Sequence, residues 1–318
     1  MINPRKAAVV GCGNVGSAIA FSLMQRAIFS DLVLIDADEG KARGEAMDLS
    51  HGAPYAGATD VAQGDYRDAE DSALMIVTAG AAQQPGQTRL ELMERNARIL
   101  GEIMERVCAT AFAGILLIVS NPVDVLTYEA HRLCGFPASR VFGSGTVLDT
   151  ARLKQRLSRH LGVDSRNIHA FIIGEHGDSE LAVWSSANVS GIDLDRFCAL
   201  RGRSADVRTL QSLYESVRDS AYEIIERKGS TSYGIAVAVA RIAECIVRDE
   251  QAVLPVSTVL GGEYGLSGVA LSVPAVIGRD GVETILEIPL SAKESRALQD
   301  SAARLREAIG QMRANRAN

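Results

Sequence analysis

Two stretches of this 318-residue chain carry side chains suited to acid–base chemistry and to binding a carboxylate. His176 lies in a glycine-rich stretch that predicts a flexible turn, and Asp149 and Arg152 are spaced to share one face of a predicted helix. Histidine changes its charge near neutral pH, and the planar guanidinium of arginine can bind a carboxylate through two parallel hydrogen bonds. From these residues alone, a surface ion pair and a solvent-exposed loop histidine remain open alternatives.

A third stretch predicts a dinucleotide site near the N-terminus. Gly11, Gly13 and Gly16 form a G-x-G-x-x-G pattern between a predicted strand and a predicted helix, and Asp36 lies 20 residues beyond Gly16. The three glycines permit a tight turn, the approach of backbone N–H groups to a pyrophosphate, and close packing of the helix on the strand. The carboxylate of Asp36 can accept hydrogen bonds from ribose hydroxyls and repels a 2′-phosphate. The pattern therefore favours NAD over NADP, with a glycine-rich turn that binds nothing as the weaker alternative.

These residues need a scaffold that brings distant segments together, and the apolar pattern predicts one. Short β-branched or leucine-rich runs alternate with amphipathic segments of helical length. Such alternation is typical of a parallel sheet covered by helices on both faces, and ligands bind at the carboxyl ends of the strands in such sheets. The predicted strands are 7–10, 32–35, 74–77 and 115–119, and a helix is predicted over 90–107.

The pattern changes after about Gly145. We therefore predict an α/β protein with a Rossmann-type doubly wound parallel sheet, followed by a mixed α+β substrate domain. The predicted domains are residues 1–145 for NAD binding and 146–318 for substrate binding and catalysis. In the second domain we expect a helix over 147–161, a strand over 168–173, strands near 256–260 and 268–277, and a closing helix that begins with a capping box at 291–294.

Composition limits the class of partner. A net charge of −6 without long single-sign runs predicts neither a nucleic-acid surface nor a membrane surface. The longest apolar run is far shorter than the ~18 residues that cross a bilayer. The five cysteines are dispersed without a C-x-x-C pair, and the five histidines show no metal-binding spacing. We expect no metal, a small-molecule partner, an uncleaved N-terminus and a cytoplasmic location.

Five motifs, in order along almost the whole chain, resemble the L-lactate/malate dehydrogenase family, most closely its bacterial L-lactate dehydrogenases. They are the glycine-rich turn at 11–16 and the segments 78–89, 121–124, 148–152 and 173–178. The resemblance implies hydride transfer between a nicotinamide cofactor and a 2-hydroxy acid.

The resemblance also implies roles for individual side chains. It makes His176 the acid/base group and Asp149 the partner of its second ring nitrogen. It makes Arg152 the group that binds the substrate carboxylate. Arg89, expected on a loop, would close over the substrate and stabilise charge on the carbonyl oxygen. Asn121 would contact both nicotinamide and substrate.

Further implied contacts concern the cofactor and the choice of acid. Val15 and Gly80 join the cofactor residues, and Thr231 lines the other side of the substrate pocket. Gln83 matches the position that contacts the distal substituent of the substrate, where malate dehydrogenases have arginine. Because glutamine leaves a second carboxylate unpaired in a closed site, Gln83 favours pyruvate and L-lactate. Malate, a bulkier 2-hydroxy acid and a solvent-facing Gln83 are the alternatives.

Regulation and assembly are also implied by the resemblance. Bacterial members are often activated by fructose 1,6-bisphosphate, which an arginine and a histidine bind between subunits. His169 matches the histidine, but Lys154 replaces the arginine, so weakened, altered or absent activation and a purely structural role all stay open. The expected assembly is a homotetramer acting in glycolysis and fermentation, with a dimer as the alternative. A non-catalytic NAD-binding protein is the alternative from another class, but it would be expected to lose one of the catalytic residues.

Overall fold

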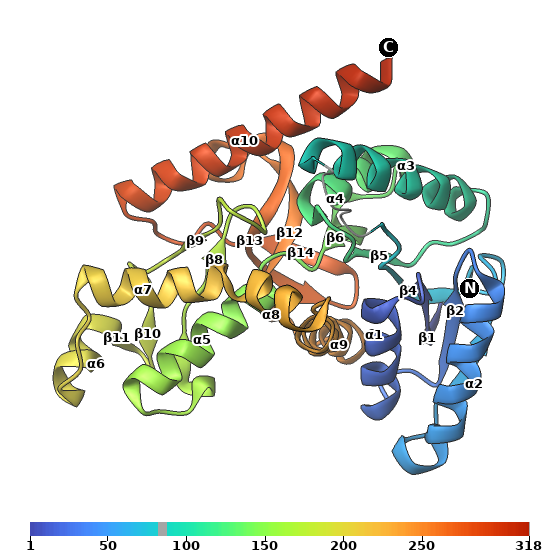
Figure 1. Ribbon diagram of the computed structural model, residues 1–318, viewed down its shortest axis with the longest axis horizontal. Helices are drawn as coiled ribbons and strands as arrows, with labels where there is room; N and C mark the ends of the chain where they lie inside the picture. Colours follow the sequence, from blue (N-terminus) through green and yellow to red (C-terminus); the bar gives the residue numbers. More distant parts are fainter. Residues whose placement is uncertain (82–87, 318) are drawn as a thin grey trace.

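The computed structural model describes residues 1–81 and 88–317, and its main feature is one large sheet (Figure 1). The sheet contains β1 (Asn3–Val10), β2 (Asp31–Ile35), β3 (Asp60–Gln63), β4 (Ser72–Val77), β5 (Ile115–Ile118), β6 (Val141–Gly143), β12 (Ala252–Gly261), β13 (Ser267–Gly278) and β14 (Gly281–Ile285). Their spatial order is β14-β13-β12-β6-β5-β4-β1-β2-β3. The six neighbouring strands β6-β5-β4-β1-β2-β3 pair in parallel, which confirms the predicted Rossmann-type sheet.

Strand β1 lies between β2 and β4 in this parallel part of the sheet. Its residue Val9 pairs with Leu34 of β2 and with Ile76 of β4. Both faces of the sheet are buried here, because Val9 and its neighbour Val10 belong to different apolar clusters. Strands buried on both faces appear in sequence as continuous apolar runs, which is why this part of the fold was predictable.

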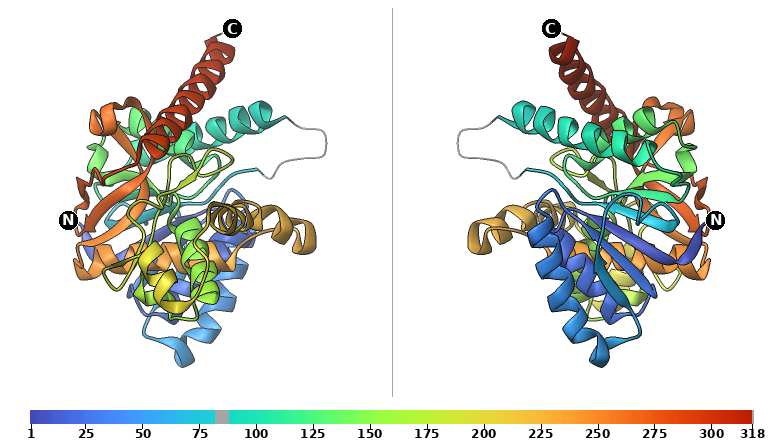
Figure 2. Two further views of the ribbon diagram at one scale, coloured as in Figure 1. Left: turned by 90° about the vertical axis from the view of Figure 1, so that its left-hand side faces the viewer. Right: turned by 90° about the vertical axis from the view of Figure 1, so that its right-hand side faces the viewer.

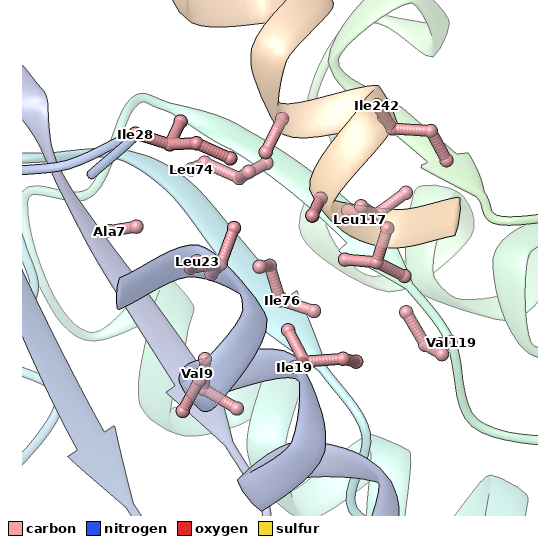
Figure 3. Close-up of a cluster of buried hydrophobic side chains, with 14 of the residues drawn as sticks. Ala7, Val9, Ile19, Leu23, Ile28, Leu74, Ile76, Leu117, Val119 and Ile242 are labelled. Atoms are coloured by element: carbon pink, nitrogen blue, oxygen red, sulfur yellow. The ribbon is translucent and has the colours of Figure 1, made fainter. Parts of the chain in front are cut away.

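Helices cover the two faces of the sheet. One face is covered by α1 (Asn14–Gln25), α2 (Glu39–Ala56) and α9 (Tyr233–Arg248). Figure 3 shows Ile19 of α1 and Ile242 of α9 over Ile76 and Leu117 of the sheet. The opposite face is covered by α3 (Arg89–Cys108), α4 (Val123–Cys134) and α10 (Ala292–Ala317), and the C-terminal end of α10 projects beyond the other elements (Figure 2).

The three longest predicted helices are present. Helix α5 (Val147–Leu161) has the predicted bounds, and α3 exceeds its prediction by one residue at each end. The predicted capping box of α10 is also confirmed. The backbone N–H of Ser291 donates to Glu294 Oε2 at 2.7 Å, and the N–H of Glu294 donates to Ser291 Oγ at 3.3 Å.

Small elements lie beside the large sheet. They are β7 (Ile168–His169), β8 (Ile172–Ile173), β9 (Leu181–Ala182), β10 (Asn188–Val189), β11 (Ile192–Asp193), α6 (Leu194–Arg201), α7 (Val207–Arg218) and α8 (Ser220–Lys228). Among them, β7, β8 and α7 contact α5. The strand predicted over 168–173 is two strands, because β7 pairs with β10 whereas β8 pairs with β9.

The strands of the C-terminal half join the first sheet. Ser257 of β12 pairs with Gly143 of β6 in antiparallel orientation, and β13 and β14 continue the sheet beyond β12. A Cβ atom at Gly143 would lie 2.5 Å from Thr127 Oγ1, so only glycine fits this junction. The apolar pattern predicted β12 and β13 but gave no sign of this pairing.

No helix among residues 1–81 and 88–317 is long and apolar enough to cross a membrane.

Candidate active site

The glycine-rich turn leaves open space in front of helix α1. A Cβ atom at Gly16 would lie 1.8 Å from the carbonyl oxygen of Gly11, so glycine is required for this close packing. Gly13 is the N-cap residue of α1 and makes no side-chain capping bond, and a Cβ atom there would contact nothing within 4 Å. The first-turn N–H groups and the helix dipole therefore face a space in which an anion is favoured.

A cleft of about 310 Å³ begins at this turn. Its lining includes the predicted cofactor residues Gly11, Gly13, Asp36 and Gly80, whereas Val15 and Gly16 lie beside it in the first turn of α1. The structure thus brings four of the predicted residues to one cavity, and their chemistry fits NAD.

The carboxylate of Asp36 is fixed at the end of β2. Its Oδ2 accepts a hydrogen bond from the backbone N–H of Cys12 at 2.6 Å, and its Oδ1 accepts from that of Asp38 at 2.9 Å. Two backbone donors therefore orient this carboxylate, and it forms no salt bridge within residues 1–81 and 88–317. Tyr66 and Arg106 also line the cleft, with the guanidinium 5.9 Å from the ring centroid. Neither residue was predicted, because Tyr66 lies in a turn and Arg106 lies on a helix whose apolar pattern gives no sign of a cofactor contact.

The catalytic candidates meet between α5 and the turn after β8, where Asp149 bridges two cationic groups. Asp149 Oδ2 lies 2.7 Å from Nδ1 of His176, and Asp149 Oδ1 accepts a hydrogen bond from Nη1 of Arg152 at 2.8 Å. Helix α5 supplies Asp149 and Arg152 from one face, and the turn after β8 supplies His176. The side chain of Asp149 is 3% exposed and that of His176 is 27% exposed. The sequence-predicted triad is therefore assembled.

The pKa values in this triad follow from burial and from opposite charges. Burial raises the pKa of Asp149, but the charges and hydrogen bonds of His176 and Arg152 outweigh it and leave the pKa below its ordinary value. Burial lowers the pKa of His176, but the charge and hydrogen bond of Asp149 raise it more, to about 9. His176 is thus an imidazolium at neutral pH, able to donate a proton.

Asp124 contacts the same turn from α4. Its Oδ2 accepts a hydrogen bond from the backbone N–H of His176 at 2.7 Å, and its Oδ1 accepts one from the hydroxyl of Ser257 at 2.6 Å. Burial raises the pKa of Asp124 to about 6, against the lowering effect of these two hydrogen bonds. Asp124 belongs to the predicted motif 121–124, but the resemblance implied a role only for Asn121.

A third carboxyl group, Glu180, lies beside the triad. One ligand atom from each of Asp149, His176 and Glu180 lies within 4.8 Å of the others. Glu180 is 5% exposed, and its Oε1 has no hydrogen-bond partner among the described residues. Burial, followed by the nearby charge of Asp149, raises the pKa of Glu180 to about 8. This carboxyl group is therefore largely protonated at neutral pH, and the sequence contained no signal of it.

Arg89 pairs with Asp178 and is not hydrogen-bonded to any described residue of the triad. The prediction that it belongs to a loop was wrong, because Thr88 and Glu91 form a capping box that starts α3 at Arg89. The Arg89 side chain is 72% exposed, and its Nη1 donates to Asp178 Oδ2 at 2.5 Å. The Tyr222 hydroxyl accepts from Arg89 Nη2 at 3.1 Å and donates to Asp178 Oδ1 at 2.8 Å. Asp178 thus connects Arg89 to the turn that carries His176.

The remaining substrate-pocket candidates come from three places. Asn121 precedes α4, and its carbonyl oxygen accepts a hydrogen bond from Asn96 Nδ2 at 2.8 Å. Thr231 lies half-buried in the connection between α8 and α9. Among the described residues, neither side chain is hydrogen-bonded to His176 or Arg152. Gln83 lies outside the described residues.

Neither member of the predicted regulatory pair is hydrogen-bonded to the triad in the part of the chain that the structure describes. Lys154 is on α5 and His169 is on β7, two elements that contact each other. Lys154 is half-buried, and burial lowers its pKa, whereas His169 is exposed.

Comparisons with known proteins identify one family over most of the chain. The NAD binding domain of lactate/malate dehydrogenases matches residues 5–143, and the alpha/beta C-terminal domain of the same family matches residues 146–315. L-lactate dehydrogenase 1 of Clostridium acetobutylicum is 48% identical over 304 residues, which cover 96% of this chain and 97% of that protein. L-lactate dehydrogenase of Moorella thermoacetica is 48% identical over 310 residues, with 97% and 98% covered.

Solved structures agree with this family. A lactate dehydrogenase enzyme from a deep-sea metagenome library superimposes with a TM-score of 0.93 at 42% identity, covering 98% of this chain and 99% of that one. The minor L-lactate dehydrogenase of Enterococcus mundtii, in a ligand-bound form, has a TM-score of 0.93 at 41% identity, covering 96% and 98%. The chain therefore belongs to the lactate/malate dehydrogenase family, as its five motifs predicted, and it carries the NAD binding domain of that family.

Proposed function

We propose that this protein is an NAD-dependent L-lactate dehydrogenase that interconverts pyruvate and L-lactate, with His176 as the acid/base group. The observation that carries the proposal is the buried carboxylate of Asp149 held between His176 and Arg152. This arrangement combines a proton donor with a carboxylate-binding cation. The names of the similar proteins from Clostridium acetobutylicum and Moorella thermoacetica support the choice of reaction.

The chain's own residues divide the work of pyruvate reduction. When bound, NADH supplies the hydride that reaches the carbonyl carbon. Asp149 occupies Nδ1 of His176, so Nε2 is the nitrogen that donates a proton to the carbonyl oxygen. Arg152 uses Nη1 for Asp149, which leaves its other N–H groups for the substrate carboxylate. Arg89 supplies a further positive charge after it leaves Asp178.

The cofactor would be held by the cleft at the glycine-rich turn. The N–H groups at the start of α1 would bind the pyrophosphate, with Gly13, Val15 and Gly16 in contact with it. Asp36 would accept hydrogen bonds from the ribose hydroxyls. Asn121 and Thr231 would enclose the nicotinamide and the substrate. The boundary between the NAD-binding and catalytic parts would lie at residues 145/146, which the ends of the two family matches support.

The choice of pyruvate over oxaloacetate would depend on Gln83. Replacing it by arginine would pair the second carboxylate of oxaloacetate, so Gln83→Arg should shift the ratio of kcat/KM values toward oxaloacetate by about 100-fold. NADH oxidation with pyruvate, oxaloacetate and 2-oxoisocaproate measures this ratio. Gln84→Arg is the matched control, because it adds the same charge one residue away. An unchanged ratio in Gln83→Arg would contradict the assignment of the substrate.

Assembly and regulation form a separate part of the proposal. The protein would act as a cytoplasmic homotetramer in glycolysis and fermentation, and Lys154 and His169 would bind a phosphate group of fructose 1,6-bisphosphate. Sedimentation gives the assembly, and a titration of activity with the sugar bisphosphate at low pyruvate tests the site. Activation that Lys154→Ala abolishes would support the site, and a flat response of the unmodified protein would contradict it.

A further inference from the structure

We infer that Asp124 is a positioning residue for His176, a role that rests on the proposed function of His176 as the acid/base group. Asp124 lies in the first turn of α4, and it is 1% exposed. Its two carboxylate oxygens bind different segments, since one accepts from the backbone of His176 and the other from Ser257 of β12. These partners are 52 and 133 residues away along the chain. The carboxylate therefore joins α4, the turn that carries His176, and β12.

The turn that carries His176, here called the catalytic turn (residues 174–178), is held at three successive backbone N–H groups. That of Gly174 donates to the carbonyl oxygen of Ser272 at 2.9 Å, and that of Glu175 donates to Ser301 Oγ at 2.9 Å. The N–H of His176 donates to Asp124 at 2.7 Å. Of the three acceptors, only Asp124 carries a charge, and hydrogen bonds to charged groups are the stronger ones. Asp124 is therefore the main anchor at the catalytic residue itself.

Asp124 also connects the catalytic turn to the cofactor side of the site. It lies three residues after Asn121, where the chain leaves β5 and enters α4. Asp149 holds the imidazole ring of His176, and Asp124 holds its backbone N–H, so both the side chain and the main chain of His176 are fixed. This places the proton donor at a set distance from the segment that would contact the nicotinamide.

The energetics indicate a functional reason for Asp124. Burying a carboxylate costs several kcal/mol unless it is paired or fully hydrogen-bonded. Among the described residues, Asp124 forms no ion pair with a lysine or arginine, and its two hydrogen bonds come from neutral donors. A neutral amide at this position could make the same two hydrogen bonds without the cost of burying a charge, so the charge itself favours function over stability.

Asp124 affects His176 through its charge in addition to its hydrogen bond. Burial lowers the pKa of His176, and among the groups that raise it Asp124 follows Asp149 and precedes Glu180. Asp149 comes from α5, and Glu180 and Glu175 flank the turn; the charge of Glu175 acts on Asp124 itself. Removing the charge of Asp124 should therefore lower the pKa of His176 while Asp149 and Glu180 remain.

Two substitutions separate geometry from charge. In Asp124→Asn the amide oxygen can accept from the N–H of His176 and the amide nitrogen can donate to the Ser257 hydroxyl, so only the charge is lost. Asp124→Ala removes both hydrogen bonds. Ser301→Ala is the matched control, because it removes the neighbouring anchor of the same turn at Glu175. His176→Asn is measured beside them to test the proposed function separately.

The readouts are kcat and KM for pyruvate, the apparent pKa in the pH profile of kcat/KM, and the Kd for NADH by fluorescence. We expect Asp124→Ala to lower kcat/KM about 100-fold, mainly in kcat, because the proton donor is misplaced. We expect Asp124→Asn to retain kcat within about tenfold while the apparent pKa falls by about one unit. Ser301→Ala should change kcat less than about threefold, because a neutral anchor is lost and the charged one stays. The Kd for NADH should stay within about twofold in all three, since cofactor binding uses other groups.

Several outcomes would overturn the inference. It fails if Asp124→Asn and Asp124→Ala keep the kcat and pH profile of the unmodified protein while His176→Asn is inactive; in that case the proposed function stands. It also fails if Ser301→Ala lowers kcat as much as Asp124→Ala. An active His176→Asn would overturn the proposed function and this inference together. If Asp124→Ala does not fold, the pH profile of Asp124→Asn decides, and an unchanged apparent pKa counts against the inference.

Discussion

The nucleotide cleft and the catalytic cluster use the chain in different ways. The cleft presents mainly backbone at Gly11 and Gly13, and two backbone N–H groups orient the carboxylate of Asp36 there. The catalytic cluster is built from buried ionisable side chains whose pKa values depend on one another, as Asp149 and His176 show. Substitutions in the cleft should therefore change affinity, whereas substitutions in the cluster should change the chemistry and its pH dependence.

The largest expected effect comes from the centre of the cluster. Asp149→Asn removes the charge that stabilises the imidazolium and fixes its tautomer, so kcat/KM for pyruvate should fall on the order of 10³-fold. The apparent pKa of His176 should move down from about 9. The Kd for NADH should stay within about twofold, because none of the described residues that line the cleft is hydrogen-bonded to Asp149 or His176. A large loss of NADH affinity would break the distinction between the regions.

A smaller effect of the opposite kind is expected in the cleft. Asp36→Ala removes the group that would bind the ribose, so the Kd for NADH should rise about tenfold. At saturating NADH the kcat should remain near that of the unmodified protein. The preference for NADH over NADPH should also decrease, because the carboxylate no longer repels a 2′-phosphate. Steady-state kinetics with both cofactors tests this, and a kcat that falls as far as the affinity would contradict it.

The smallest effect on activity is expected at Glu180. Its carboxyl is largely protonated at pH 7, so Glu180→Gln should keep kcat within about twofold there. Its effect should appear in stability instead. The folded-state pKa of about 8 lies above the unfolded value near 4.5, so the native protein holds a proton that the unfolded chain releases. The stability that this proton contributes is present below pH 4.5 and is lost as the pH rises toward 8.

Calorimetry at pH 5 and pH 8 measures this contribution. Glu180→Gln cannot lose that proton, so its Tm should exceed that of the unmodified protein by a few degrees at pH 8 and match it at pH 5. Glu175→Gln, which changes another acidic residue near His176, is the control. An equal difference in Tm at both pH values would show that Glu180 does not titrate in this range.

Much of the sheet could be predicted from sequence, and the exceptions have physical reasons. The buried parallel strands β1, β2, β4 and β5 appear as apolar runs. Strand β3 lies at the edge with one buried residue, Val61, and β6 has three residues, so neither has a distinctive pattern. The pairing of Ser257 with Gly143 is a contact between distant segments, which periodicity does not encode.

The two functional regions differ in the same respect. The cleft was predictable because one contiguous motif and one residue at a fixed spacing define it, as Gly13 and Asp36 illustrate. In the cluster, spacing placed Asp149 beside Arg152, but the contact with His176 followed only from the family resemblance. Asp124 and Glu180 were missed because a buried carboxyl cannot be distinguished in sequence from a solvent-exposed one.

The pH dependence of kcat/KM for pyruvate tests the account of the catalytic cluster most directly. His176 must be protonated to donate to the carbonyl oxygen, and kcat/KM reports its pKa before pyruvate binds. Buried carboxylates that hold the imidazolium predict a constant kcat/KM through neutral pH that declines with an apparent pKa of about 9. A decline centred near 6.5, the ordinary value for histidine, would contradict the account.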